Sequence, residues 1–278
     1  MEAAKPFQQI VIEPKSGWQL INWGELLRSR DLLYFLVWRD IKVVYKQTVL
    51  GFAWAVVNPV FGMLIFTVVF GRLAKMPSDG IPYPIFAYAA LLPWSYFSAA
   101  WAGSSQSLIS SANMLTKVYF PRIIIPLAPV LAKLVDFGVA MLILIVLMAW
   151  YKIAPSGNFI FLPLLVLAMA VTALGMGLWL SALAIQYRDV KHLIPFLSQF
   201  LMYAAPVVWP ASLIPEKYRL LYGLYPMAGV IEGFRSALTG ARPMPWDLIG
   251  IGSLSALIMA VSGALYFRRM ERTFADVA

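Results

Sequence analysis

The stretch QTVLGFAWAVVNPVFGMLIFTVVFG, residues 47–71, decides the fold class, because no charged side chain interrupts it. A helix needs roughly 20 apolar residues to cross the hydrocarbon core of a bilayer. Further apolar stretches lie at residues 80–116, 123–151, 153–187, 193–215 and 248–267, and only the one at 123–151 contains charged residues. The sequence therefore predicts an all-α integral membrane protein with six transmembrane helices.

The composition supports a membrane protein. Hydrophobic residues make up 61% of the 278 residues and charged residues 13%, with a mean hydropathy of +0.77. Soluble proteins carry about 25% charged residues, and one soluble core could not bury this much apolar surface. The chain has no cysteine and a single histidine, which excludes disulfides, thiolate metal sites and histidine metal clusters within one chain.

The distribution of positive charge predicts the orientation. With the N-terminus inside, the inner segments hold about twice as many Lys and Arg residues as the outer loops, which is typical of the cytoplasmic side. We therefore expect a multi-pass protein of a bacterial inner membrane with both termini in the cytoplasm. The same bias explains the net charge of +9 better than nucleic-acid binding does.

Three domains follow from this pattern: a cytoplasmic N-terminal segment (1–49), a six-helix permease domain (50–267) and a cytoplasmic tail (268–278). No signal peptide is expected, because the first strongly apolar stretch begins near residue 47. Within the N-terminal segment, RDLLYFLVWRDIKVVYK (30–46) places apolar and basic residues on different helical faces. This indicates an amphipathic interface helix at about 31–48, either a surface anchor or also a docking place for a cytoplasmic partner.

Two loops contain signals for short helices. Residues 104–122 are rich in serine and end in Phe120-Pro121-Arg122, which fits either a cytoplasmic docking helix or an ordinary connector. Pro226 and Gly240 bracket a second segment, which is too short to span. We expect short re-entrant or periplasmic helices here, one starting after Pro215, that either gate a pathway or rest on the headgroups. The gate residues would be Pro226, Met227, Glu232, Phe234 and Arg235.

Lys133 and Asp136 are the only charged residues within a predicted span. Their spacing of three lets them neutralise each other on one helix face. A structural pair is favoured over a transport role, and the scarcity of further buried charges argues against a proton-coupled mechanism.

Aromatic residues recur on single faces of three predicted spans. Such stripes could stack on sugar rings along a pathway, or they could serve helix packing and lipid contact. The residues are Trp54, Phe61, Phe66 and Phe70 in the first span, Trp94, Phe97 and Trp101 in the second, and Phe196, Phe200 and Tyr203 in the fifth.

The sequence contains no G-x-x-x-x-G-K-[ST] loop, no metalloprotease motif and no nucleophile elbow. The chain is therefore not expected to be an enzyme or to hold a cofactor. Any energy from ATP would have to come through another subunit.

Several motifs in order resemble one family. WRDIKVVYKQTVLGFAW (38–54), FPRIIIP (120–126), YRDV (187–190), AAPVVWP (204–210) and LYPMAGVIEGFR (224–235) are similar to ABC-type polysaccharide exporter permeases, which export O-antigen, capsule or teichoic acid chains. The resemblance covers roughly residues 30–265. It implies a homodimer with two ATP-binding subunits, which bind ATP and Mg, and a lipid-linked polysaccharide substrate.

The resemblance also assigns roles to residues. Arg39, Asp40, Lys42 and Lys46 would lie at the cytoplasmic interface, where the basic ones could bind the pyrophosphate of the undecaprenyl carrier. The loop with Asn113, Lys117, Phe120 and Arg122 would contact the ATPases. The channel would form between two permeases, lined partly by the first and fifth spans, and would carry most plausibly O-antigen for lipopolysaccharide biosynthesis. Teichoic acid or capsule export, a small-molecule or drug ABC permease, and a membrane-embedded glycan-modifying enzyme are the alternatives.

Overall fold

The computed structural model describes residues 23–46, 53–115 and 120–271, and within these ranges every regular element is helical. The N-terminal elements are α1 (Trp23–Arg28), α2 (Arg30–Lys46), α3 (Ala53–Phe66) and the π-helix η1 (Thr67–Leu73). The central elements are α4 (Tyr83–Ser110), α5 (Ala112–Leu115), α6 (Ile124–Trp150), the 3₁₀ helix η2 (Gly157–Phe161) and α7 (Leu162–Gln186). The last are α8 (Val190–Ala204), η3 (Ala211–Leu213), α9 (Glu216–Gly223), α10 (Pro226–Thr239) and α11 (Trp246–Glu271).

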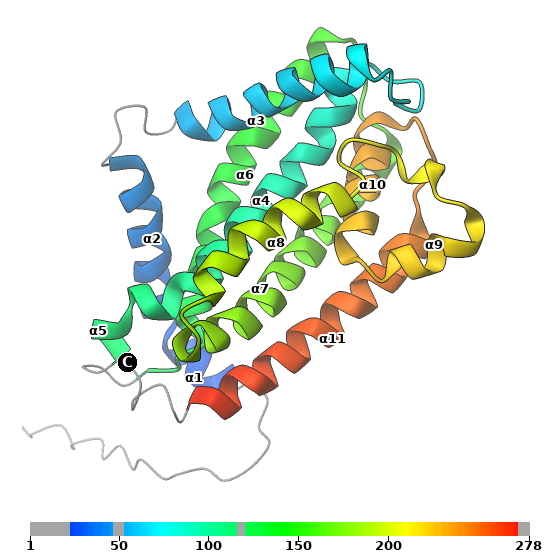
Figure 1. Cartoon of the computed structure of the whole chain (residues 1–278). Coiled ribbons are helices and arrows are strands. Elements are labelled where there is room, and N and C mark those ends of the chain that lie inside the picture. Colours follow the sequence, from blue (N-terminus) through cyan, green and yellow to red (C-terminus); the bar gives the residue numbers. More distant parts are fainter. Residues whose placement is uncertain (1–22, 47–52, 116–119, 272–278) are drawn as a thin grey trace, which may run out of the picture.

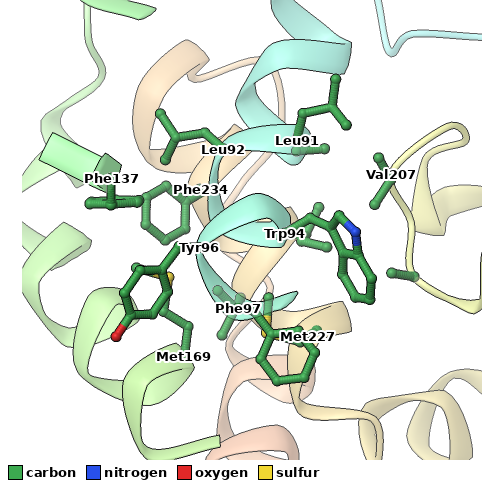
Figure 2. Packing of buried hydrophobic residues seen from close by; sticks show 14 of the residues in the cluster. Leu91, Leu92, Trp94, Tyr96, Phe97, Phe137, Met169, Val207, Met227 and Phe234 are labelled. Atoms are coloured by element: carbon green, nitrogen blue, oxygen red, sulfur yellow. The ribbon is translucent and has the colours of Figure 1, made fainter. Parts of the chain in front are cut away.

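Helix α4 is the centre of the bundle. It packs chiefly against α6 and α7, and α11 packs on the other side of α7. Figure 2 shows Trp94 and Phe97 of α4 within this core, with Phe137 of α6 against Phe234 of α10. The core lies inside the helix bundle, so the outer surfaces of the long helices remain apolar and exposed, as lipid contact requires.

Small residues allow the closest helix contacts. A Cβ atom on Gly177 of α7 would lie 2.1 Å from the Oγ atom of Ser104 in α4. One on Gly175 would lie 2.8 Å from the backbone nitrogen of Ala260 in α11. Larger side chains at these glycines would force the helices apart, because helix packing in a membrane depends on such close approach.

By length and composition, four helices are able to cross a membrane: Ala53–Leu73, Ile124–Trp150, Gly157–Gln186 and Trp246–Glu271. Helix α4 has the length but is less hydropathic, because serines, tyrosines and prolines interrupt it. Helix α8 is shorter than the expected fifth span at 193–215, because Ala205 precedes Pro206 and takes an extended conformation. Its 15 residues cover about 22 Å, short of the roughly 30 Å hydrocarbon core.

Helix α3 stands apart from the other long helices. Figure 1 shows it crossing over α4 and α6 instead of running alongside them. Within it only Pro59 and Met63 are buried. A helix this apolar and this exposed needs lipid or another protein chain to cover it.

The bundle has two distinct ends (Figure 1). Helices α1 and α5 and the last turn of α11 lie at one end, and α9, α10 and the first turn of α11 lie at the other. The predicted cytoplasmic and periplasmic elements are thus separated by the length of the bundle.

Candidate functional site

The short helices α9 and α10 form where proline and glycine predict them. Helix α9 begins directly after Pro215, and α10 runs from Pro226 to Thr239. Gly240 then adopts a left-handed conformation with φ of +64° and donates its N–H to the carbonyl of Ser236. Glycine ends the helix here because it takes this conformation without strain.

Helix α10 lies inside the protein rather than on its outer surface. Every residue of it except Thr239 is buried, against α4, α7 and α11. The predicted gate residues Pro226, Met227 and Phe234 therefore pack in the core of a single chain. This placement makes α10 a support for its neighbours, and the gate role of these residues stays a prediction.

Glu232 and Arg235 form a buried ion pair. The Arg235 Nη1 and Glu232 Oε1 atoms lie 2.8 Å apart, with only 5% and 10% of the two side chains exposed. Arg235 also donates from Nη2 to the carbonyl of Val207 at 2.8 Å, and its guanidinium lies 3.5 Å from the ring centre of Phe86. Desolvation by burial lowers the pKa of Arg235, although Glu232 opposes the shift; arginine nevertheless stays charged in proteins.

The ion pair holds the segment between α8 and η3. Besides Val207, Arg235 reaches the carbonyl of Trp209 at 3.4 Å, and Glu232 accepts the N–H of Ala211 at 2.9 Å. Tyr83 of α4 also donates to the carbonyl of Val208. A buried segment without regular structure needs such partners for its backbone groups.

Two tyrosines bind the last turn of α8, which leads into this segment. Tyr222 of α9 donates to the carbonyl of Ala204 at 2.9 Å, and Tyr225 to that of Leu201 at 3.2 Å. The end of α8 is therefore fixed from α4, α9 and α10 together. The sequence predicted none of these contacts, because their partners lie far apart along the chain.

The three aromatic stripes have different surroundings. Trp94, Phe97 and Trp101 of α4 are buried in the core, which supports the packing interpretation over sugar stacking for this stripe. On α8, by contrast, Phe196, Phe200 and Tyr203 are 64%, 61% and 55% exposed. On α3, Trp54 and Phe61 are exposed, whereas Phe66 of α3 and Phe70 of η1 are half-buried, with their rings edge to face.

The intramembrane pair is present in α6. Lys133 Nζ and Asp136 Oδ2 lie 2.8 Å apart, and both side chains are partly buried. Tyr45 of α2 donates its hydroxyl to Asp136, a contact that sequence reasoning missed. Burial, and then the bond to Asp136, raise the pKa of Tyr45, so its phenol keeps the proton that it donates. These contacts favour a structural role, linking α2 to α6.

The basic residues of α2 differ in whether an acidic side chain pairs with them. Arg39 donates from Nε and Nη2 to Asp40 Oδ1, at 3.0 and 2.8 Å. Lys42 lies 5.2 Å over the ring of Trp38, and Lys46 is exposed at the end of the helix. The positive charge of this surface therefore comes mainly from Lys42 and Lys46.

The predicted coupling residues gather at the end of the bundle that holds α1 and α5. Asn113 lies in the one-turn helix α5, Phe120 is buried, and Arg122 Nη1 donates to the carbonyl of Glu271 at 2.6 Å. Lys117 lies outside the described residues. The expected docking loop is thus shorter than its sequence suggests, because α4 continues to Ser110 and takes in most of its serines.

Within the described ranges, no group of three or more His, Asp or Glu side chains is placed to hold a metal ion. The features of this chain are two exposed aromatic faces, a buried ion pair and a basic helix surface.

Comparison with known proteins agrees with this picture. The model of the ABC-2 type transporter family matches residues 31–239. The O-antigen export system permease protein RfbA is 26% identical in Klebsiella pneumoniae and 28% identical in Myxococcus xanthus, each over 89% of this chain and 95% of the relative. The polysialic acid transport protein KpsM of Escherichia coli is 24% identical over 84% of this chain and 91% of its own. Because the family model covers most of its length, the chain belongs to the ABC-2 type transporter family.

Proposed function

We propose that this chain is the membrane subunit of an ATP-driven exporter of polysaccharide, most specifically O-antigen, from the cytoplasmic to the periplasmic side. The observation that carries the proposal is the alignment of 89% of this chain with nearly the full length of permeases named for O-antigen export. The exposed aromatic face of α8 supports it, because aromatic rings can stack on the apolar C–H faces of sugars.

The working unit would be two copies of this chain with two ATP-binding subunits. The apolar faces of α3 and α8 are too large to remain uncovered, and a second copy could cover part of them and form a channel between the two. The ATP-binding subunits would dock at the end with α5 and Arg122 and would bind ATP and Mg, since the sequence has no P-loop.

Six spans would then cross the inner membrane: α4, α6, α7, α8 and α11, together with α3, which lies across α4 and α6 and would cross at an angle to them. In this arrangement α4 depends on its neighbours to cover its polar groups, and α8 reaches the outer side together with residues 205–210. The surface of α2 with Lys42 and Lys46 would receive the pyrophosphate of an undecaprenyl-linked glycan from the inner leaflet. Both termini would be cytoplasmic.

Capsule export is the second candidate, favoured by the similarity to a protein named for polysialic acid transport. Deleting the gene and identifying the lipid-linked glycan that accumulates inside the cell separates the candidates. We expect accumulation of undecaprenyl-linked O-antigen and loss of surface O-antigen, both restored by the intact gene. Accumulation of capsule polymer would favour the second candidate, and unchanged glycans would contradict both.

A further inference from the structure

A pocket lined by both charged and apolar side chains lies where α9 and α10 meet two loops at the predicted outer end. Its volume is about 150 Å³. The walls come from the loop before α4, η3, α9, α10 and the loop that leads into α11. Its polar side chains include Asp79, Ser212, Arg219, Glu232, Arg235 and Arg242.

The charges around this pocket almost cancel. Asp79 pairs with Arg242, whose Nε lies 2.9 Å from Oδ2, and accepts the hydroxyl of Ser212 at 3.2 Å. Glu232 pairs with Arg235 inside the pocket, and Arg219 is bound by Asp247 just outside it. A site so balanced has little preference for a free ion, because each charge already has its partner.

Two of these groups nevertheless keep unused hydrogen-bonding capacity. Arg242 meets Asp79 through Nε, which leaves its two terminal amino groups as donors among the described residues. Glu232 receives both of its partners at Oε1, which leaves Oε2 as an acceptor. A hydroxyl group suits this combination, because it accepts from a guanidinium and donates to a carboxylate.

The size of the pocket restricts the ligand further. Its volume lies below the roughly 300–1,000 Å³ typical of drug-sized sites. A single ring with several hydroxyl groups is small enough for a pocket of this size.

The pocket is also connected to the exposed face of α8. Arg235 and Glu232 line the pocket and hold the backbone of residues 207–211, which continues from the end of α8. Whatever occupies the pocket therefore contacts the same pair that positions this end of α8.

We propose that this pocket binds one hydroxyl-rich sugar residue of the exported glycan at the outer mouth of the channel. The inference rests on the proposed polysaccharide export and adds a binding site for a single residue of the chain. Glu232 Oε2 and the terminal amino groups of Arg242 bind the hydroxyl groups, and Ser212 lies beside them.

The test uses the full complex of permease and ATP-binding subunits in lipid nanodiscs. Glucose, galactose, mannose, rhamnose and glucuronic acid are added singly, and hydrogen–deuterium exchange is measured. We expect at least one neutral sugar to protect residues 79–82, 211–219 and 236–245 in a saturable manner. If no sugar protected these residues, the proposal would be overturned. It would also be overturned if only glucuronic acid protected them and this protection disappeared at high salt.

Matched variants locate the binding. Ala241→Phe fills the pocket without removing an ion pair, and Arg242→Gln removes the free donors. Each should weaken binding by about tenfold or more, the equivalent of one hydrogen bond to a charged group. Lys217→Gln removes an exposed charge of α9 that does not line the pocket, and should leave binding unchanged. Equal affinity in all three variants would contradict the assignment, and thermal unfolding of each complex confirms that it is folded.

Complementation in cells separates this proposal from the proposed function. If the intact gene restores surface glycan but the purified complex binds no sugar at the pocket, polysaccharide export stands and the pocket assignment falls. If the intact gene restores no surface glycan, polysaccharide export itself is contradicted.

Discussion

Helices α8 and α10 have nearly the same length, yet their surroundings are opposite. Helix α10 has every residue except Thr239 buried, including an ion pair. Helix α8 buries only Val190 and Ile194 and exposes an aromatic face. The sequence predicted a pathway role for residues of both helices, but in a single chain only α8 exposes an aromatic face.

The comparison separates the role of the charged residues of α10 from that of the aromatic residues of α8. The charges of α10 hold backbone: they satisfy the irregular segment from Val207 to Ala211 and so fix the end of α8. The aromatic residues of α8 have no such task within the chain. We infer that α10 supplies rigidity and α8 supplies the contact surface.

The largest effect is expected from breaking the ion pair of α10. Arg235→Met leaves Glu232 buried and uncompensated, which should lower the free energy of unfolding by about 3–5 kcal/mol. The measurement is thermal or denaturant unfolding of the purified permease complex. The double variant with Glu232→Gln should recover most of the loss, because glutamine can still accept from Ala211. A single variant as stable as the original would contradict the supporting role of α10.

The second prediction concerns the exposed face of α8. Replacing Phe196, Phe200 and Tyr203 together with alanine should reduce surface glycan about tenfold or more, if each ring contributes about 0.5–1.5 kcal/mol of stacking. Stability and ATPase binding should change little, because the rings are exposed. Alanine at Leu254, Leu257 and Ile258, an equally exposed face of α11, is the control and should leave export intact. Normal export by the α8 variant would contradict sugar stacking.

A smaller effect is expected at the contact between α2 and α6. Tyr45→Phe removes the hydroxyl that binds Asp136. A hydrogen bond to a charged group contributes about 1.5–3 kcal/mol to the free energy of unfolding, and this contact is partly exposed, so we expect a loss no larger than that. Hydrogen–deuterium exchange of α2 and thermal unfolding measure the loss. Tyr34→Phe on the same helix keeps its ring stacked on Trp38 and should change neither quantity. Equal behaviour of the two variants would mean that the Asp136 contact is not structural.

The smallest effect is expected from the exposed pair of Arg219 and Asp247, at the outer side of α9. The hydrogen bond to Asp247 raises the pKa of Arg219, but a solvent-exposed pair contributes only about 0–1 kcal/mol. Arg219→Gln should therefore lower stability slightly in low salt, with the difference vanishing at high salt, where exposed charges are screened. A loss as large as that of Arg235→Met would contradict the contrast between buried and exposed pairs.

Local sequence signals predicted several helix boundaries well. Pro226 and Gly240 mark the ends of α10, and Pro215 precedes α9, because each residue restricts or permits one backbone conformation. The pairing of Lys133 with Asp136 was also predictable, since residues three apart share a helix face.

Contacts between distant segments could not be predicted in this way. The stripe of Trp94, Phe97 and Trp101 looked like that of α8, but periodicity does not tell whether a face meets another helix or a substrate. Glu232 and Arg235 lie three residues apart and share a helix face, yet the carbonyls that Arg235 binds depend on how α10 sits between α4 and residues 207–209.

The central claim, that the glycan passes along the exposed face of α8 and not through the core around α4 and α10, can be tested by photo-cross-linking in cells that make the polysaccharide. A photoreactive phenylalanine analogue replaces Phe200 in one strain and Phe97 in another, and the permease is probed for attached glycan after illumination. The account predicts a glycan adduct at position 200 and none at position 97. No adduct at position 200, or equal adducts at both positions, would contradict it.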